Sequence, residues 1–300
     1  PKTSTLRQYM LYFLENEYFK VGIESMGAEL QHLIKKDEDL ELIWTGDPAI
    51  WASHAPNLFP IVGELPNQQY TYEDQAYNMG RHGFARKKEF ELVEEHKKKL
   101  VFELKDDEET LDQYPFEFRL LIAYKLEGNK LEVTYQVLNE DKKAMWFSIG
   151  GHPGFNVPLY PNEQYTDYYL EFDKEETLRR YLIDSNGLQT GDSELIAENA
   201  QVLPLTHQYF DKDAIILKGL DSKRLVLASH TGPRKIEIEF EGFPYLGIWA
   251  KPGPSPYVCI EPWCGIASSN SGSGKLEDKE GINELRPKQV FERTYSITVW

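Results

Sequence analysis

The middle of the chain holds a histidine set among residues that restrict the backbone. His152 follows Gly150 and Gly151 and precedes Pro153. The glycines reach backbone conformations closed to other residues and leave space beside the imidazole. Pro153 disfavours a helix through His152. Because an imidazole exchanges protons near neutral pH, the stretch indicates a proton-transfer site. Taken alone, it is equally consistent with a tight turn that carries an exposed histidine.

A carboxylate lies in a second stretch of this kind, Cys259-Ile260-Glu261-Pro262-Trp263-Cys264-Gly265. Contact with Trp263 would partly desolvate Glu261, and desolvation raises the pKa of a carboxyl group and makes it a plausible proton acceptor. The competing interpretation is a structural carboxylate bonded to neighbouring amides. This stretch alone favours that interpretation.

Two further stretches place polar groups among glycine, proline and aromatic residues: Asn57 to Gly63, and Arg81-His82-Gly83-Phe84-Ala85-Arg86. His82 has a cation on each side. We expect His54 to line a cleft. The remaining histidines have polar or charged neighbours and no glycine frame, and we expect them at the surface: His32, His96, His207 and His230.

Several other chemistries have no support in the sequence. It has no glycine-rich phosphate loop, no His/Cys/Asp cluster at metal-ligand spacing and no nucleophile elbow around serine. A Cys–His pair between His152 and Cys259 or Cys264 is conceivable, but a cysteine without a nearby cation is more often a small buried hydrophobe. The sequence therefore carries no motif for a metal or an organic cofactor.

Composition limits the possible partners. The 300 residues carry a formal net charge of −16, which repels nucleic acids and anionic membrane surfaces. No apolar run approaches the roughly 20 residues of a membrane span. The two cysteines fit no disulfide framework, which favours a cytoplasmic location. Residues 1–9 resemble a leader before Met10.

Alternation of apolar and polar residues dominates the rest of the chain and predicts strands. It is clearest at 116–124, 131–137, 235–240 and 295–299, with a hairpin across Gly128-Asn129. Only single helical turns are expected, at 48–51 and 110–114, and the acidic run 106–109 and the stretch 268–274 are expected to be loops. This pattern predicts one antiparallel all-β sandwich domain over residues 1–300.

Four stretches together resemble the aldose 1-epimerase (galactose mutarotase) family, in particular its LacX-like branch. They occur in the family's order, and the tail 275–279 also fits: Leu58 to Gly63, Arg81 to Arg86, Gly151 to Asn156 and Glu261 to Gly265. The resemblance implies a large antiparallel β-supersandwich. It also implies interconversion of the α and β anomers of a hexose or hexose phosphate without a cofactor.

The resemblance also implies residue roles. Glu261 takes the position of the base that removes the anomeric hydroxyl proton, and His152 that of the acid that protonates the ring oxygen. His82 takes the position of a second histidine near the ring oxygen. The residues expected to bind the sugar are Arg81, Arg86, Asp213, Asn156 and Trp263.

The chain departs from the family pattern at Glu64, where many relatives have arginine. Arg81 or Arg86 is expected to replace that cation. A non-catalytic sugar-binding or regulatory protein is the main alternative. A glycosidase is less consistent with the sequence, because it needs two carboxylates. The expected partner is a small sugar, and the protein is expected to be a monomer or a homodimer.

Overall fold

The computed structural model describes residues 9–300, so most of the suggested leader, residues 1–8, lies outside the described part of the chain. Strands make up most of the structure, and every strand pair between named strands is antiparallel. The prediction of an all-β fold is therefore confirmed. Within residues 9–300, no helix has the length and apolar character needed to cross a bilayer.

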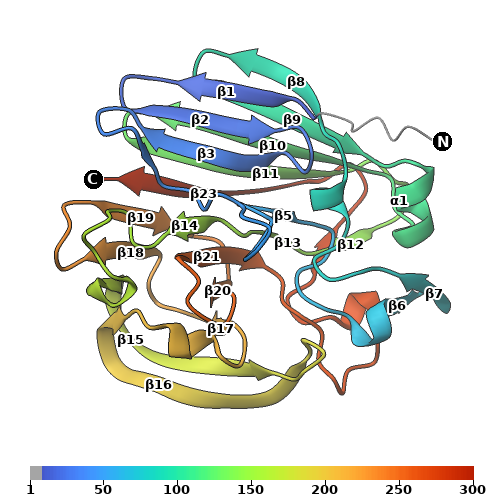
Figure 1. Cartoon of the computed structure of the whole chain (residues 1–300). Helices are drawn as coiled ribbons and strands as arrows, with labels where there is room; N and C mark the ends of the chain where they lie inside the picture. The colour runs from blue at the N-terminus through green and yellow to red at the C-terminus, as the bar shows by residue number, and fades with distance from the viewer. Residues whose placement is uncertain (1–8) are drawn as a thin grey trace, which may run out of the picture.

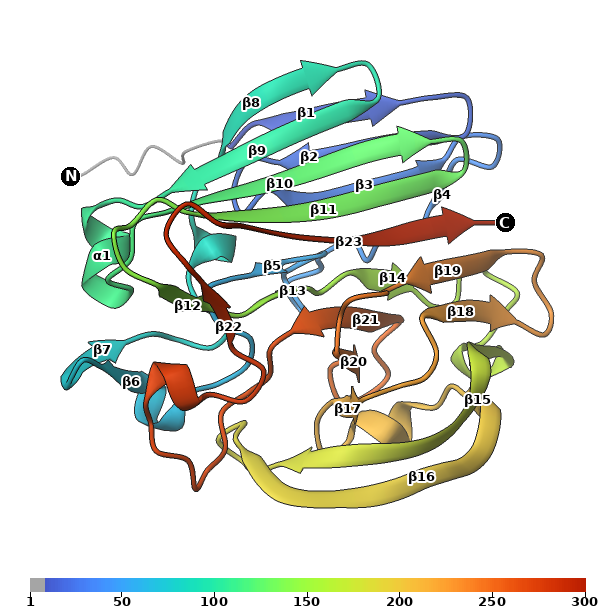
Figure 2. The same ribbon diagram turned by 180° about the vertical axis from the view of Figure 1, so that it is seen from behind.

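The largest sheet has nine strands and extends from β8 at one end of the molecule to β16 at the other (Figures 1 and 2). In spatial order its strands are β16 (Gln189–Pro204), β15 (Tyr168–Ile183), β18 (Arg224–Ser229), β19 (Lys235–Glu239), β23 (Val290–Val299), β11 (Lys130–Asn139), β10 (Phe118–Glu127), β9 (Lys99–Lys105) and β8 (Glu91–His96).

The central hairpin of this sheet shows why the alternating pattern predicted strands. In β10 the residues Phe118, Leu120 and Ile122 are buried, and the residues between them are half-buried. Glu127 pairs with Lys130 at the turn, and Gly128 has φ 58° there, a conformation that favours glycine. The predicted hairpin is confirmed, with β10 beginning two residues later than expected.

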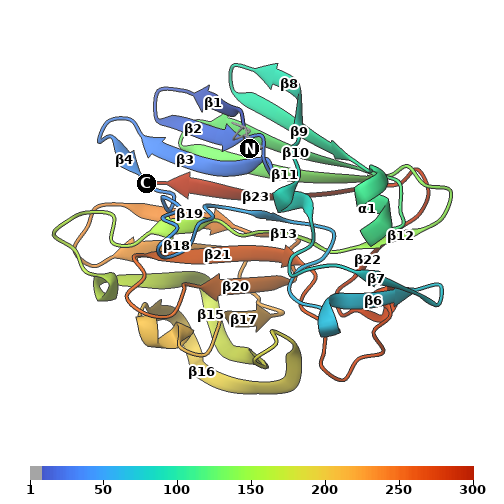
Figure 3. The same ribbon diagram turned by 45° about the vertical axis from the view of Figure 1, so that its right-hand side comes forward.

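Smaller sheets pack against this large one. The view in Figure 3 brings the six-stranded sheet forward, with β13, β21 and β20 side by side. Its strands are β17 (Ile215–Lys218), β20 (Tyr245–Trp249), β21 (Tyr257–Cys264), β13 (Ile149–Gly151) and β5 (Asn57–Leu58), with β14 (Gly154–Asn156) also on β21. The four-stranded sheet has β1 (Leu11–Glu15), β2 (Phe19–Glu24), β3 (Glu29–Lys35) and β4 (Leu40–Glu41). The two-stranded sheets are β12 (Met145–Phe147) with β22 (Asn283–Leu285), and β6 (Gln69–Tyr72) with β7 (Gln75–Asn78).

Helices are few and short. One α-helix, α1 (Glu108–Gln113), begins inside the acidic run that was predicted to be a loop. That prediction is wrong because Asp107 accepts a hydrogen bond from the Thr110 backbone N–H at 2.7 Å while the Thr110 hydroxyl accepts one from the Asp107 N–H, a reciprocal cap that starts a helix. The 3₁₀ turns are η1 (Pro66–Gln68), η2 (Ala85–Lys87), η3 (Tyr165–Asp167), η4 (His207–Phe210) and η5 (Leu276–Asp278).

Candidate active site

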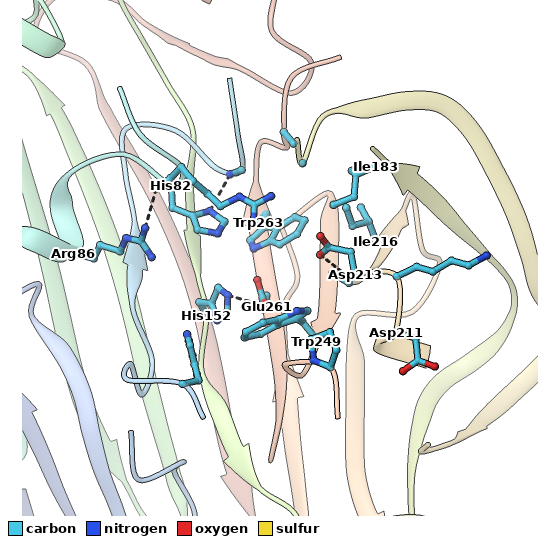
Figure 4. Close-up of a pocket in the computed structure, with 18 residues that line it drawn as sticks. His82, Arg86, His152, Ile183, Asp211, Asp213, Ile216, Trp249, Glu261 and Trp263 are labelled. Atoms are coloured by element: carbon cyan, nitrogen blue, oxygen red, sulfur yellow. Dashed lines mark hydrogen bonds and ion pairs between the residues drawn. The ribbon is translucent and has the colours of Figure 1, made fainter. Parts of the chain in front are cut away.

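A cavity of about 470 Å³ opens beside the six-stranded sheet, a volume within the usual range for small-ligand sites. It lies against β20 and β21, and Ile183 and Gly187 at the turn of the long β15–β16 hairpin also line it (Figure 4). Its lining residues are Trp51, Gly63, Arg81, His82, Arg86, His152, Ile183, Gly187, Asp211, Lys212, Asp213, Ala214, Ile216, Trp249, Pro252, Glu261, Trp263 and Ala267.

Strand β21 supplies the floor of the cavity. Glu261 and Trp263 are two residues apart and therefore share one face of the strand. A Cβ on Gly150 would lie 2.6 Å from Trp263 Cδ1, and one on Gly247 would lie 2.5 Å from Cζ2. Gly150 belongs to β13 and Gly247 to β20, the two strands that flank β21. The Trp263 ring therefore lies across the sheet, in space that these two glycines leave open.

His152 lies in the extended segment between β13 and β14, as the proline after it predicted. The role predicted for the glycines before it is wrong. Neither Gly150 nor Gly151 has a positive φ. The space beside Gly150 holds Trp263, and the space beside Gly151 holds the ring of Tyr295, 2.8 Å from a hypothetical Cβ. These glycines accommodate aromatic rings.

Tryptophans surround the imidazole of His152 on its other sides. The ring centroid of Trp51 lies 5.1 Å from that of His152, and the centroid of Trp249 lies 5.8 Å from it in an edge-to-face arrangement. These walls leave His152 only 8% exposed. Burial lowers its pKa well below the ordinary value, because the imidazolium would lose its hydration, and the charges of Arg86 and Arg81 act in the same direction.

Glu261 faces His152 across a short gap. Its Oε1 lies 3.1 Å from His152 Nε2 (Figure 4), and the carboxylate is 1% exposed. Burial raises the pKa of Glu261 well above its ordinary value. The Trp263 N–H and Arg81 oppose the shift, and Asp213 adds to it. Because both charged forms are disfavoured by burial, the pair holds one proton over the neutral range and stays neutral overall.

Three buried polar atoms at this place have no directed hydrogen-bond partner: His152 Nδ1, Glu261 Oε1 and Trp263 Nε1. His152 Nε2 and Glu261 Oε1 are close enough for a hydrogen bond, at 3.1 Å, but they are not aligned for one. Buried polar groups are nearly always paired, so unpaired ones at the bottom of a cavity are what a polar ligand would satisfy.

His82 completes the group. Its ring centroid lies 5.8 Å from that of His152. The backbone N–H of Gly63 donates to the ring nitrogen Nδ1 of His82 at 2.9 Å. The backbone N–H of His82 donates to the Gly63 carbonyl at 2.9 Å. A neutral His82 therefore carries its proton on Nε2. Burial lowers the pKa of His82 well below its ordinary value, and the charges of His152, Arg86, Arg81 and Lys279 act in the same direction.

The other predicted binding residues divide into two groups. Arg81, Arg86, Asp213 and Trp263 line the cavity. Asn156 does not, because its amide nitrogen donates to the backbone carbonyls of Glu41 and Ile43 at 3.0 Å each. Asn156 is therefore a structural residue that ties β14 to the four-stranded sheet, and it is removed from the predicted binding set.

Arg81 lies beside Glu64 and lines the cavity. Its Nε is 3.7 Å from the carboxylate of Glu64, the residue at which the chain departs from the family pattern. Arg86 donates to the Arg81 carbonyl at 3.0 Å, and both arginines line the cavity together with His82.

Asp213 lines the cavity from a loop that Arg180 holds in place. Its backbone has φ 127°. Arg180 donates to the carbonyls of Asp213 and Ala214 at 2.6 and 3.2 Å.

His54 does not line this cavity, so that prediction is wrong. His54 Nδ1 lies 2.8 Å from the Trp44 carbonyl, and a Cβ on Gly46 would lie 2.6 Å from His54 Nε2. The ring therefore packs against the backbone of residues 44–46, just before the turn that carries Trp51. That turn, at 48–51, is the single turn predicted from the sequence, with the Trp51 N–H bonded to the Asp47 carbonyl.

One group of side chains has the spacing of a metal site. Ligand atoms of His152, Cys259 and Glu261 all lie within 4.8 Å of one another. Burial raises the pKa of the Cys259 thiol well above its ordinary value, and the Glu261 charge adds to the shift. The Cys259 thiol would have to lose this proton to ligate a metal ion, and the group offers only three protein ligands. This donor set therefore does not favour a metal ion.

Several lining residues were not predicted from the sequence, among them two tryptophans, Trp51 and Trp249. Trp249 lies on β20 opposite Cys259. The signal was available in Tyr245-Leu246-Gly247-Ile248-Trp249, where an alternating face carries two aromatic residues around a glycine. Such a face is typical of a strand on which aromatic rings pack.

Comparison with known proteins gives the same family that the sequence motifs resemble. A family model described as aldose 1-epimerase matches residues 10–274. The chain is 36% identical over 294 residues to the chromosomal LacX protein of Lactococcus lactis subsp. lactis, covering 95% of this chain and 98% of that protein.

Two solved structures are similar over nearly their whole length. One is a galactose mutarotase related enzyme from Lactobacillus acidophilus, with 37% identity, a TM-score of 0.93 and 97% of each chain covered. The other is a galactose mutarotase-like protein from Lactobacillus casei, with 34% identity, a TM-score of 0.91 and coverage of 97% of this chain and 100% of that one. The fold is therefore the galactose mutarotase-like β-supersandwich, and the chain belongs to the aldose 1-epimerase family, in its LacX-like branch.

Proposed function

We propose that the protein is a mutarotase that interconverts the α and β anomers of a hexose or hexose phosphate. The observation that carries the proposal is the buried pair of His152 and Glu261 at the bottom of the cavity, 3.1 Å apart and without directed hydrogen-bond partners. The family membership supports the same reaction class.

The spacing of the pair suits the reaction. The anomeric hydroxyl and the ring oxygen of a sugar are bonded to the same carbon, so a base for one and an acid for the other must lie side by side. His152 and Glu261 meet that requirement and together hold one proton. In the proposed step, the shared proton first moves from Glu261 to His152 as the sugar hydroxyls bind to the pair. Glu261 then removes the proton of the anomeric hydroxyl while His152 protonates the ring oxygen, and the bond from C1 to the ring oxygen breaks.

The ring opens to an aldehyde, which rotates about C1–C2 and closes by the reverse transfers. Both residues then regain their starting protonation states, so no other reactant is consumed. His82, with its proton on Nε2, donates a hydrogen bond toward the ring oxygen. Trp263, Trp249 and Trp51 supply apolar faces for the sugar and exclude water, which strengthens the polar contacts inside the cavity.

The test is an anomer-exchange assay by polarimetry or NMR over a panel of aldoses and their 6-phosphates. Exchange must be measured above the spontaneous rate and must rise in proportion to the concentration of the protein. We expect at least one sugar to be turned over. Binding of a sugar with no exchange above background would overturn the proposal in favour of a binding or regulatory protein.

A further inference from the structure

Lys279 is a buried cation that does not line the cavity and that the proposed reaction does not use. Its side chain is only 7% exposed, and lysine is almost never buried without a charged partner. Within residues 9–300 it has no ion pair, and the adjacent Glu280 is bonded to Lys218 at 2.8 Å. Instead the Lys279 Nζ donates to two backbone carbonyls, that of Val62 at 3.1 Å and that of Ile266.

The Val62 carbonyl connects Lys279 to the active site. It belongs to the same peptide group as the N–H of Gly63, and that N–H donates to Nδ1 of His82 at 2.9 Å. A single peptide therefore lies between the lysine and the histidine. An ammonium bonded to the oxygen of a peptide draws electron density from it and makes its N–H a stronger donor, since hydrogen bonds in a chain polarise one another.

We propose that Lys279 is a positioning residue that acts through the Val62–Gly63 peptide to keep the proton of His82 on Nε2. The strengthened Gly63 N–H holds Nδ1 as an acceptor, so Nε2 carries the hydrogen and offers it to the cavity. The inference about the His82 proton stands on contacts alone. Its consequence for catalysis, donation to the sugar ring oxygen, rests on the proposed mutarotase function.

The charges around His82 also favour its neutral form, because they lower its pKa. Arg81, Arg86 and His152 face the imidazole from the cavity side, and Lys279 lies behind it. All four disfavour an imidazolium at His82. Two carboxylates of this region are already paired with cations, Glu64 with Arg81 and Glu280 with Lys218. His82 is thereby kept as a neutral donor, and the transferred proton stays with His152 and Glu261.

The local backbone explains why such support is needed. Gly63 has φ 75° and His82 has φ 65°, both in the left-handed region, which is uncommon for a residue other than glycine. A Cβ on Gly63 would lie 2.6 Å from Ala267. Lys279 bonds both sides of this contact, Val62 before Gly63 and Ile266 before Ala267. A purely structural role as a clamp is therefore the alternative to be tested.

The test compares Lys279→Met, which removes charge and donors, and Lys279→Gln, which keeps an amide donor, with the unaltered chain. Lys218→Met is the matched control, because it removes a cation bonded to Glu280 but contacts neither Val62 nor Ile266. Nitrogen-15 NMR of histidine-labelled protein, with His82→Gln to assign the signal, reports which ring nitrogen of His82 carries hydrogen. No sugar is needed. Spectra are recorded at about pH 6, since burial lowers the pKa of Lys279 to about 7.

We expect His82 to show protonated Nε2 and bare Nδ1 in the unaltered chain and in Lys218→Met. In Lys279→Met the Nδ1–H form becomes populated and the pKa of His82 rises. Lys279→Gln, if Lys279→Met does not fold, should show the same changes to a smaller degree. An unchanged His82 tautomer and pKa in a folded Lys279 variant would overturn the proposal and leave only the clamp.

Activity gives a separate readout. Loss of a residue that orients a catalytic histidine typically costs about 10–100-fold in activity, as with the partners of metal-bound histidines. We expect that loss in kcat for Lys279→Met, with a smaller change in KM. If the native protein exchanges no anomers, the proposed function fails while the NMR result still decides the role of Lys279. If the His82 tautomer changes but kcat does not, Lys279 still positions the His82 proton, and only the proposed donation from His82 to the sugar ring oxygen is contradicted.

Discussion

At the residue scale, the site depends on two ionisable groups that burial pushes away from their charged forms. Glu261 and His152 are 1% and 8% exposed. Burying a charge costs free energy that must be recovered from a partner. In the free protein they recover part of it from each other, and a sugar hydroxyl supplies further hydrogen bonds. The same burial that tunes the pair for catalysis should therefore reduce the stability of the protein.

This cost gives a prediction for Glu261→Gln. The folded-state pKa of Glu261 is raised above its unfolded value near 4.5. Its contribution to stability is therefore fully present below about pH 4.5 and is lost as the pH rises through the folded-state pKa. Glu261→Gln should be more stable than the native chain at about pH 8 and show little gain at about pH 4.5, measured by denaturant unfolding. The surface variant Glu117→Gln is the control. A gain independent of pH would show that the carboxylate is not desolvated.

Arg81 is the second residue with a defined expectation. Its Nε lies 3.7 Å from Glu64, and it lines the cavity while its side chain is 42% exposed. If it replaces the cation expected at position 64, Arg81→Ala should raise KM for the sugar several-fold and leave kcat nearly unchanged, as loss of uniform binding does. Steady-state exchange rates give both constants. An unchanged KM would mean that Glu64 is not compensated by Arg81.

At the element scale, three neighbouring strands build the floor of the cavity. β21 carries Glu261 and Trp263, and the flanking strands β13 and β20 place Gly150 and Gly247 around the indole ring. The residues that do chemistry are therefore positioned by glycines that do none. Because protein interiors are closely packed, one added methyl group at these glycines must displace the ring.

Gly150→Ala tests this packing. The new Cβ would lie 2.6 Å from Trp263 Cδ1 and 3.0 Å from the Pro262 carbonyl, and overpacking of this kind typically costs about 1–3 kcal/mol. We expect lower stability in denaturant unfolding and weaker sugar binding through a displaced Trp263, seen as a shift in tryptophan fluorescence. Gly272→Ala is the control, since its Cβ would meet nothing closer than 3.6 Å. Equal behaviour of the two variants would show that Trp263 does not need Gly150.

At the scale of the whole molecule, the sequence predicted the fold class more completely than the site. Long strands such as β10 and β11 have ten residues each, enough for the alternating pattern to be unambiguous. Three short strands beside the site, β5, β13 and β14, have two or three residues, too few for any periodicity. The convergence of His82, His152 and Glu261 on one cavity was expected only through the family resemblance.

The errors have the same origin. Asn156 was assigned to the sugar through the family resemblance, and His54 to a cleft because of its aromatic and proline neighbours. Whether a polar side chain contacts a ligand or the backbone depends on the segment that lies beside it. For Asn156 that segment is 41–43, more than a hundred residues earlier in the chain. That the chain forms one domain, and whether it is a monomer or a homodimer, stay predictions.

The central claim is that Glu261 and His152 perform the proton transfers of anomer exchange. It is tested most directly by measuring catalysed exchange for the native chain, Glu261→Gln, His152→Asn and the double variant on one sugar that the native chain turns over. Each single variant should lose about 10²–10⁴ in kcat with little change in sugar affinity. The double variant should be little worse, because acid and base serve one step. Catalysed exchange by Glu261→Gln at the native rate would contradict the account.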